Sequence, residues 1–540
     1  MSLRLSYFFS AIALGILYLS LTATKISNFD FWWHLKTGEW ILEHRTFPTT
    51  DLFSLESVRG VWHNGHGLFQ LAIASIHSLF GIQALTLFQM LWGGLLFYGI
   101  FRNSERNVLC FPLFLVAFLC LSRRFMLRPE LFTFGFILIY VLILSRPKKQ
   151  TVLCLPLLQI IMTNTHSAFL LGPVILFLKS LASYFTKEKK EALSPRFYFS
   201  VLGLTLLACT ISPFGIEGLW FPITLIPKVF GHSDIYKSTI LEFAPPQWLG
   251  ADWIYLIYFL VLGIFLISWI RERNIFAALV VLFFAVLAEQ ATRNFNLLLF
   301  ASLPLIVRSP FFLKLAERIR VPLKLGIAIS IGALALQYSF LFASDILYHQ
   351  QNRLQRFGLG FNDCVFSKTL PGFLKKIHGD VRLFNSMSLG GYLIYHAPHL
   401  KVFFDGRLEA YSETHYLTYL KMISDLDFFI EESEKRGINL VVLNHSIHEG
   451  AELMPLKGIP GWNLTYLDAF VVVFAKNDLI KENLWMSEFD LQNSYDRMKL
   501  EVQEKDPVEQ ELENAVFHLA IEEMGLNLNS AVKWAHGDGL

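Results

Sequence analysis

Long apolar runs alternate with short polar connections over the first 345 residues of the chain. A run of roughly 20 apolar residues can cross a bilayer as a helix, and a shorter run can cross where neighbouring helices line it. Residues 66–80 carry apolar side chains at helical spacing and predict a helix that lies along the membrane interface. The pattern predicts an all-α polytopic membrane domain over 1–345, with a first outer loop at 24–81. Its eleven expected transmembrane helices are 4–23, 82–101, 108–121, 129–145, 151–163, 168–184, 197–213, 253–270, 274–289, 293–308 and 323–345.

The pattern changes near residue 346 to that of a soluble domain. Strands alternating with helices predict a small α/β domain with a largely parallel sheet over 346–480. The motif FDGR (404–407) stands where a predicted strand ends, and a turn with Asp405 or Arg407 in a local ion pair is favoured there over a catalytic role. Residues 481–540 predict a charged helical tail. The expected strands are 381–384, 401–404, 438–443 and 469–475, and the expected helices are 388–396 and 412–436.

Composition supports the membrane assignment. Of the 540 residues, 54% are hydrophobic and 17% are charged, whereas soluble proteins are about 45–50% apolar and about 25% charged. The net charge of +2 indicates neither a nucleic acid nor an acidic partner. The five cysteines show no CxxC or His/Cys spacing, so we expect neither a disulfide framework nor a zinc site. Because the first apolar run is followed by a weak cleavage site and by further spans, we interpret it as an uncleaved helix.

Basic residues mark one side of the membrane. With eleven spans, every basic loop falls on the side of the amino terminus, and the positive-inside rule makes that side the cytoplasm. The outer side then holds 24–65, 122–130, 163–167, 214–252, 289–294 and everything after 346. The assignment would invert if the helix at 66–80 crossed the membrane. The basic residues are Arg4, Arg102, Arg106, Arg146, Lys148, Lys149, Lys187, Lys189, Lys190, Arg271, Arg273, Lys314, Arg318, Arg320 and Lys324.

The outer helix ends collect ionisable and amide side chains. Asp30 follows the first span directly in NFDFWWH, where it is either a functional carboxylate or an N-cap of the next helix. Trp32, Trp33 and Trp40 are expected to be interfacial anchors. Ionisable groups at a membrane boundary are functional candidates by default. The candidates for substrate binding are His34, His63, His66, Arg124, Arg128, Glu130, Asn164, His166, Arg293 and Asn294.

Each of these candidates has a structural alternative. A single histidine at a helix end is more often a hydrogen-bonded structural group, and His63 and His66 share a metal only if a helix or tight turn brings them together. Arg123 and Arg124 are long enough to reach anionic head groups without any catalytic role. Arg128 and Glu130 are close enough in sequence to pair with each other.

Several short motifs occur in a fixed order along the chain and include many of these positions. In the order of these motifs, the chain resembles the GT-C class of membrane glycosyltransferases, which includes the dolichyl-phosphate-mannose mannosyltransferases and the aminoarabinose transferases. It is also similar, more closely, to a group of largely uncharacterised bacterial membrane proteins with the same motif order over most of 1–475. The motifs are FDFWWHLKTGEWI (29–41), PTTDLFS (48–54), WHNGH (62–66), LFG (79–81), RPELFTF (128–134), NTHSAFLLG (164–172), SPFG (212–215), RNFNLLLFASLP (293–304) and FFDGR (403–407).

The resemblance implies a polyprenyl-phosphate sugar donor and a site on the outer face. Asp30 matches the acid after the first span and is expected to be the catalytic base. Arg128, Arg293 and Arg124 are expected to bind the lipid phosphate. Glu130 stands roughly where the class places a second acid. Many class members carry adjacent acids after the first span, whereas this chain has Asp30 alone, so no cofactor is certain and the need for a divalent metal stays open.

The sequence therefore predicts an integral membrane glycosyltransferase-like protein. It would move a sugar from a polyprenyl-phosphate carrier to a glycan, lipid or protein acceptor outside a bacterial inner membrane, with the C-terminal domain in the periplasm. One alternative is a non-enzymatic membrane subunit or lipid-binding scaffold of an envelope polysaccharide system. A second is a transporter or flippase, but the sequence shows neither charges in mid-span nor an inverted repeat.

Overall fold

The computed structural model describes residues 2–56, 61–102, 107–185, 193–230, 236, 239–247, 253–351, 353–363, 365–502 and 507–524. Contacts divide the chain into two compact units. The helical unit comprises Met1–Ile26 and Asn64–Phe361, and the α/β unit comprises Ser27–His63 and Asn362–Leu540. Most of the loop after the first helix therefore packs with C-terminal residues, whereas the sequence had grouped it with the membrane domain.

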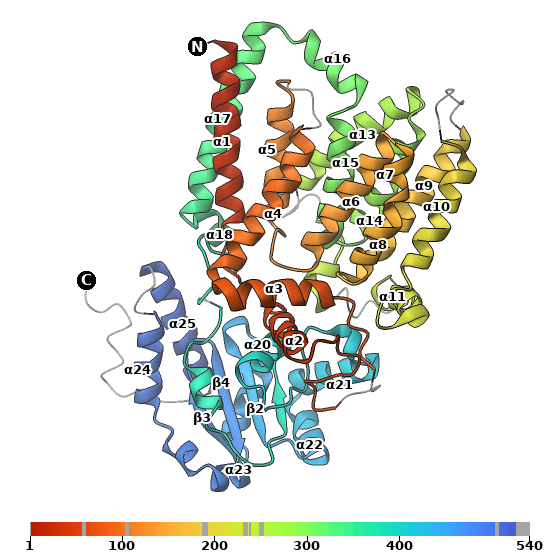
Figure 1. The fold of residues 1–540 in the computed structure, drawn as a ribbon. Helices are drawn as coiled ribbons and strands as arrows, with labels where there is room; N and C mark the ends of the chain where they lie inside the picture. The colour runs from red at the N-terminus through yellow and green to blue at the C-terminus, as the bar shows by residue number, and fades with distance from the viewer. Residues whose placement is uncertain are drawn as a thin grey trace. The chain divides into compact units, whose positions relative to one another are not determined.

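Every apolar run that the sequence predicts to be a span contains a helix in the helical unit (Figure 1). Three short 3₁₀ turns, at Ser167–Leu170, Leu241–Phe243 and Thr292–Asn294, lie between these helices. The helices are α1 (Leu3–Thr22), α3 (Gly67–Phe80), α4 (Gln83–Arg102), α5 (Cys110–Leu121), α6 (Glu130–Ser145), α7 (Lys149–Leu153), α8 (Leu155–Thr163), α9 (Leu171–Phe185), α10 (Pro195–Ala208), α11 (Gly215–Phe230), α13 (Trp253–Arg271), α14 (Ile275–Gln290), α15 (Phe295–Ile306), α16 (Pro310–Arg318), α17 (Val321–Ala343) and α18 (Ile346–Gln350).

Judged by helix length and composition, fewer helices can cross a membrane than the sequence predicts. Among the described residues, five helices are long and apolar enough to cross a membrane: α1, α4, α9 with its preceding 3₁₀ turn, α13 and α17. A sixth is added if the pair before and after the 66° bend at residues 307–309 counts as one broken span. The remaining apolar helices have 10–17 residues. An apolar helical membrane unit is thus present, and the expected count of eleven spans is not confirmed.

Packing inside the helical unit fixes where its polar helix ends lie. The core helix α15 is buried at all twelve positions, as expected for a helix that is apolar on every side. Phe300 of α15 stacks on Phe134 of α6 with ring centroids 5.0 Å apart, so these two helices run side by side. Consequently the start of α6 and the turn before α15 belong to the same end of the unit.

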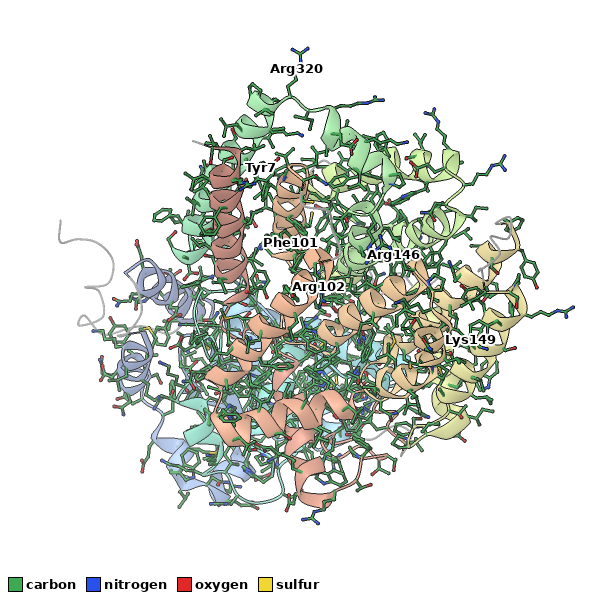
Figure 2. The ribbon with its side chains drawn as sticks, turned by 45° about the horizontal axis from the view of Figure 1, so that its top comes forward. Tyr7, Phe101, Arg102, Arg146, Lys149 and Arg320 are labelled. Carbon is green, nitrogen blue, oxygen red and sulfur yellow. The ribbon has the colours of Figure 1, made fainter. Side chains whose placement is uncertain are left out.

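Basic side chains lie at the other end of the helical unit. Figure 2 shows Arg102, Arg146, Lys149 and Arg320 over the end that carries the start of α1. These positions belong to the basic loops from which the sequence assigned the cytoplasmic side. Four further members of that set, Arg106, Lys187, Lys189 and Lys190, lie outside the described residues.

The sheet of the α/β unit is mixed. Its strands are β1 (Leu383–Asn385), β2 (Leu440–Asn444), β3 (Trp462–Leu467) and β4 (Val471–Lys476), in the order β1-β2-β4-β3. Only β1 and β2 are parallel, so the prediction of a largely parallel sheet is wrong. The reason is the tight turn between β3 and β4, because strands joined by such a turn are antiparallel. Asp468 holds this turn by accepting hydrogen bonds from the amides of Phe470 and Val471 at 2.8 and 2.7 Å.

Helices of the α/β unit occupy nearly the predicted ranges. The expected helix at 412–436 divides at Asp425, whose carboxylate caps the second half by accepting from the Phe428 amide at 3.0 Å. The run KVFF (401–404) is not a strand of the sheet, and only Val402 forms an isolated bridge, with Ser54. The helices are α2 (Phe31–His44), α19 (Leu370–Leu374), α20 (Met387–His396), α21 (Glu413–Ser424), α22 (Leu426–Arg436), α23 (Asn477–Glu482), α24 (Leu491–Val502) and α25 (Pro507–Glu523).

Helix α2 is a packed element of the α/β unit. Trp32 and Trp33 are each 3% exposed. The Trp32 ring contacts Phe366 and Tyr392, with centroids 5.4 Å away in each case. The expectation that these two tryptophans are interfacial anchors is therefore wrong, because the aromatic side chains that follow residue 362 bury them.

Candidate functional site

Asp30 stands at the start of α2, but its side chain does not cap the helix. The residue has φ −72° and ψ −21°, which is helical backbone, and its carboxylate accepts no capping hydrogen bond. The Trp33 indole Nε1 instead donates to Asp30 Oδ1 at 3.4 Å. The interpretation of Asp30 as only an N-cap is therefore wrong, and its carboxylate points to other partners.

One of those partners is the FFDGR turn (Phe403–Arg407). A Cβ placed on Gly406 would overlap Asp30 Oδ1 and lie 3.1 Å from its Cγ. A Cβ on Gly391 of α20 would likewise lie 2.6 Å from the Phe29 carbonyl oxygen. Phe29 and Asp30 therefore pack directly against the backbone of Gly391 and Gly406, where any larger residue would clash.

Arg407 is the centre of a buried ionic network. Its Nη2 donates to Asp405 Oδ2 at 2.7 Å and to Ser54 Oγ at 3.1 Å, and its Nη1 donates to Asp51 Oδ1 at 2.8 Å. The side chains of Arg407 and Asp405 are fully buried. The predicted local ion pair is confirmed, and it extends to Asp51 of the PTTDLFS turn, which the sequence had not linked to it.

Burial and charge in this network shift several pKa values. Desolvation acts against the charged form of Asp51, but the Arg407 cation and hydrogen bonds from Ser54 and the Phe53 amide together outweigh it and lower the pKa of Asp51. Desolvation likewise opposes the Arg407 cation, but Asp405, Tyr411 and Asp51 together raise its pKa well above the usual value. Nearby Glu409 accepts a hydrogen bond from Trp62 Nε1 at 3.3 Å, and burial raises its pKa to about 7. The turn thus carries one fixed ion-paired cluster and one carboxyl that titrates near neutrality.

The two histidines of the α/β unit that were expected to bind substrate differ in burial. His34 is 3% exposed, and its backbone amide donates to the Asp30 carbonyl at 3.3 Å in the first turn of α2. Its ring lies against Trp33 with centroids 3.5 Å apart. His63 is half-buried in the irregular segment that follows Trp62.

In the helical unit, three of the predicted phosphate-binding residues share one carboxylate. Glu242 Oε2 accepts hydrogen bonds from Arg124 Nη2 and Arg128 Nη1, both at 2.9 Å. Arg293 Nη1 lies 3.5 Å from Glu242 Oε1. Arg128 therefore pairs with Glu242, and the alternative of an Arg128–Glu130 pair is wrong. Arg123 lies instead over the ring of Tyr255, 5.6 Å from its centroid.

Contacts made by its neighbours Phe243 and Ala244 hold the segment that carries Glu242. The Thr292 amide donates to the Ala244 carbonyl at 3.0 Å, and the Arg293 guanidinium lies 4.4 Å from the Phe243 ring centroid. Desolvation raises the pKa of Glu242, but the three arginines outweigh it and hold that pKa well below the usual value. The carboxylate is thus ionised at neutral pH, and the cluster of three guanidiniums keeps a net charge of +2.

A histidine pair lies at the same end of the helical unit. The rings of His66 and His166 are 5.5 Å apart, Thr133 Oγ1 lies 2.7 Å from His166 Nδ1, and Ser167 Oγ lies 3.3 Å from His66 Nε2. Burial lowers the pKa of both imidazoles to about 3, and the positive charge of Arg293 adds to the effect at His166. Both histidines are therefore neutral at physiological pH and can donate or accept hydrogen bonds.

The remaining candidates make mainly structural contacts. Asn164 Nδ2 donates to the Ile160 and Ile211 carbonyls, both at 2.8 Å, and Asn294 Nδ2 donates to the Leu287 carbonyl at 2.8 Å. Glu130 is partly buried at the start of α6, and its negative charge partly offsets the lowering of the His66 pKa.

Sequence reasoning missed two polar groups here. Glu242 stood unmarked in the loop 214–252, and its only signal was an acid among outer-side residues. Asn296, inside the motif RNFNLLLFASLP, is 2% exposed, and neither of its amide atoms has a hydrogen-bond partner among the described residues. A buried amide without a partner is a candidate to meet a ligand.

The described residues contain no group of three or more His, Cys, Asp or Glu side chains that fits a metal ion. Asp405 and Asp51 are already engaged by Arg407.

The apolar helical unit followed by a mixed α/β unit is a fold that solved structures of an oligosaccharyltransferase share. The chain matches the oligosaccharyltransferase of Archaeoglobus fulgidus in the apo form, with 10% identity, 87% of this chain, 74% of that chain and a TM-score of 0.53. It also matches AglB from the same organism, in complex with an inhibitory peptide and a dolichol-phosphate, with 11% identity, 97% and 87% coverage and a TM-score of 0.54.

A weaker match is ArnT from Cupriavidus metallidurans bound to undecaprenyl phosphate, with 12% identity, 89% and 99% coverage and a TM-score of 0.45. No protein-family model and no curated protein matches the chain by sequence. At these identities the likeness is one of fold.

Proposed function

We propose that this protein is an integral membrane glycosyltransferase that uses a polyprenyl-phosphate sugar. It transfers the sugar to a glycan, lipid or protein acceptor on the outer face of a bacterial inner membrane, with its α/β unit in the periplasm. The shared fold supports the general class, and the solved AglB complex contains a dolichol-phosphate. The observation that carries the proposal is a partly buried carboxylate, Asp30, that follows the first helix and serves no capping role.

Asp30 acts as the general base of a single displacement. The acceptor hydroxyl oxygen attacks the anomeric carbon, the bond from that carbon to the phosphate oxygen breaks, and the hydroxyl proton passes to Asp30. Inversion at the anomeric carbon needs one base and no covalent intermediate. The released lipid phosphate carries the electron pair of the broken bond as negative charge.

The arginines stabilise that negative charge. Arg124, Arg128 and Arg293 converge on one carboxylate, and planar guanidiniums bind phosphate oxygens in the same way. His66 and His166 stay neutral, so they can hydrogen-bond sugar hydroxyls without attracting a second anion. Glu130, Asn164, Asn294, His34 and His63 are retained as proposed substrate contacts.

The test compares purified wild type with Asp30→Asn in a transfer assay. Radiolabelled polyprenyl-phosphate sugars are offered with membrane lipid extract as acceptor. Loss of a general base lowers the rate by about 10²–10⁴-fold, while carrier binding and thermal stability should stay unchanged. Asp478→Asn, at an exposed acid of the same unit, is the matched control and should retain full activity.

Two results would contradict the proposal. Equal transfer by Asp30→Asn and wild type would remove the role of Asp30. Carrier binding by both proteins without any transfer, across the full sugar panel, would favour a non-enzymatic lipid-binding subunit.

A further inference from the structure

We propose that the FFDGR turn positions the Asp30 carboxylate, so that Gly406 and Arg407 are positioning residues of the transfer reaction. This inference rests on the proposed function, because it concerns the base of that reaction. It assigns to the C-terminal part of the chain a role in placing the base.

The first step of the argument is the contact itself. Asp30 Oδ1 occupies the place that a Cβ of residue 406 would take. Trp33 Nε1 donates to the same oxygen at 3.4 Å and lies 3.7 Å from the position of that Cβ. The carboxylate is thus confined between an indole N–H on its own helix and the bare backbone of the turn.

The second step is the rigidity of the turn. Asp405 Oδ1 accepts hydrogen bonds from the Arg407 backbone amide at 2.8 Å and from its Nε at 2.9 Å, so this acid and this cation close the turn around Gly406. Tyr411 OH donates to Asp405 Oδ2 at 2.7 Å. With both ions fully buried, the turn has little freedom to move away from Asp30.

The third step connects the turn to the chain that carries Asp30. Arg407 binds Asp51 and Ser54 of the first outer loop. Its guanidinium also lies over the rings of Phe53 and Trp62, 5.1 and 4.8 Å from their centroids. Arg407 therefore does two things. It holds the loop that follows α2, through Asp51 and Ser54, and it closes the turn that contacts Asp30 at the start of α2.

These contacts bring three separate sequence motifs together around the Asp30 carboxylate. NFDFWWH supplies the carboxylate, PTTDLFS supplies Asp51 and Ser54, and FFDGR supplies the turn. A displacement of about 1 Å at a catalytic group can lower a rate by about 10²-fold. A methyl group at position 406 must move the Asp30 carboxylate by a distance of that order.

The experiment is a double-mutant cycle on the full-length protein with two readouts. Gly406→Ala should lower kcat about 10²-fold with the KM for the donor unchanged within about twofold. Gly372→Ala, where an added Cβ meets nothing within 4 Å, is the matched control and should leave kcat unchanged. Trp33→Phe, which removes the indole donor together with part of the buried ring, should lower kcat by about two- to tenfold.

Thermal unfolding supplies the readout that does not depend on activity. Gly406→Ala should lower Tm in the wild-type background and lower it clearly less in the Asp30→Ala background, because the second change removes the atoms that the new methyl would meet. If Gly406→Ala alone does not fold, folding of the double variant demonstrates the same coupling.

The outcomes separate this inference from the proposed function. Loss of transfer in Asp30→Asn, with unchanged kcat and no thermal coupling in Gly406→Ala, would overturn the positioning role and leave Asp30 as the base. An additive Tm loss that accompanies the kcat loss would reduce Gly406 to a packing residue. Thermal coupling in a wild type that transfers no sugar would overturn both the proposed function and the catalytic meaning of the contact.

Discussion

Replacing Glu242 by glutamine tests whether the arginine cluster is an anion site. The substitution keeps the shape of the side chain and removes its charge, so the net charge of the cluster rises from +2 to +3. In the present structure Glu242 occupies the place where a lipid phosphate would contact Arg124 and Arg128 in the proposed reaction. In that reaction the carboxylate would compete with the phosphate.

The size of the competition follows from the contacts. A phosphate that binds both arginines displaces two charge-assisted hydrogen bonds of 2.9 Å. Such bonds contribute about 1.5–3 kcal/mol each. The four side chains are 15–30% exposed, however, and solvent screens exposed pairs. Taking about 1.4 kcal/mol for the whole exchange, we expect Kd for a polyprenyl phosphate to fall about tenfold in Glu242→Gln.

The assay is equilibrium binding of a labelled polyprenyl phosphate to purified protein at low and moderate ionic strength. The gain should shrink with salt, because the screening length falls from about 30 Å at 0.01 M to about 10 Å at 0.1 M. Glu217→Gln, at an exposed acid of the same unit, is the control and should bind as wild type does. Unchanged or weaker binding by Glu242→Gln would refute the competition and make Glu242 a support that orients the arginines.

Stability should change in the opposite direction. The pKa of Glu242 is lowered in the folded protein, so its ion pairs stabilise the fold above about pH 4.5 and are lost as the pH falls below that value. The Tm of Glu242→Gln without ligand should therefore lie below that of wild type at pH 7, and the gap should close in acid.

Three further predictions concern buried groups. Arg407→Met leaves Asp405 and Asp51 buried without their cation, so unfolding free energy should fall by about 3–5 kcal/mol, measured by thermal melting; a loss under about 1 kcal/mol would contradict the network. The pKa of Glu409 is raised to about 7, so keeping this buried carboxyl protonated or ionising it costs stability as the pH rises from about 4.5 through 7. Glu409→Gln should therefore be more stable than wild type at pH 8 by on the order of 1–3 kcal/mol, and the difference should close at pH 5. Equal melting temperatures of the two proteins at pH 8 would exclude this. Asn296→Leu should stabilise the protein by about 1–3 kcal/mol and weaken binding of the polyprenyl phosphate, whereas a stable variant with unchanged binding would show that the amide meets no ligand.

Helix positions in the membrane unit followed from the sequence because apolar run length is a local property. The expected segment at 82–101 is α4 at Gln83–Arg102, and the expected segment at 323–345 overlaps all but the first two residues of α17 at Val321–Ala343. The number of crossings did not follow, because α5, α6 and α14 are shorter than a full bilayer span and their burial depends on neighbours.

The sheet was harder to predict because strand partners are distant in sequence. The run WNLTYL formed β3, which the alternation of predicted strands and helices had not included. The run KVFF had strand-like composition, yet Phe403 donates its backbone amide to the side chain of Asn385 in β1 rather than to the backbone of a neighbouring strand. Composition alone does not distinguish a buried extended segment from a paired strand.

The sequence by itself determined the membrane class, the helix positions and the residue types available at each helix end. It marked Asp30, Arg124, Arg128 and Arg293 as candidates, because ionisable groups beside apolar runs are costly and therefore informative. Only the tertiary structure decided their partners. Glu242 contacts Arg128 from 114 residues further along the chain, and Gly406 contacts Asp30 from the C-terminal part of the chain. A buried ion needs its counter-ion close in space, and chain distance does not limit where that counter-ion comes from.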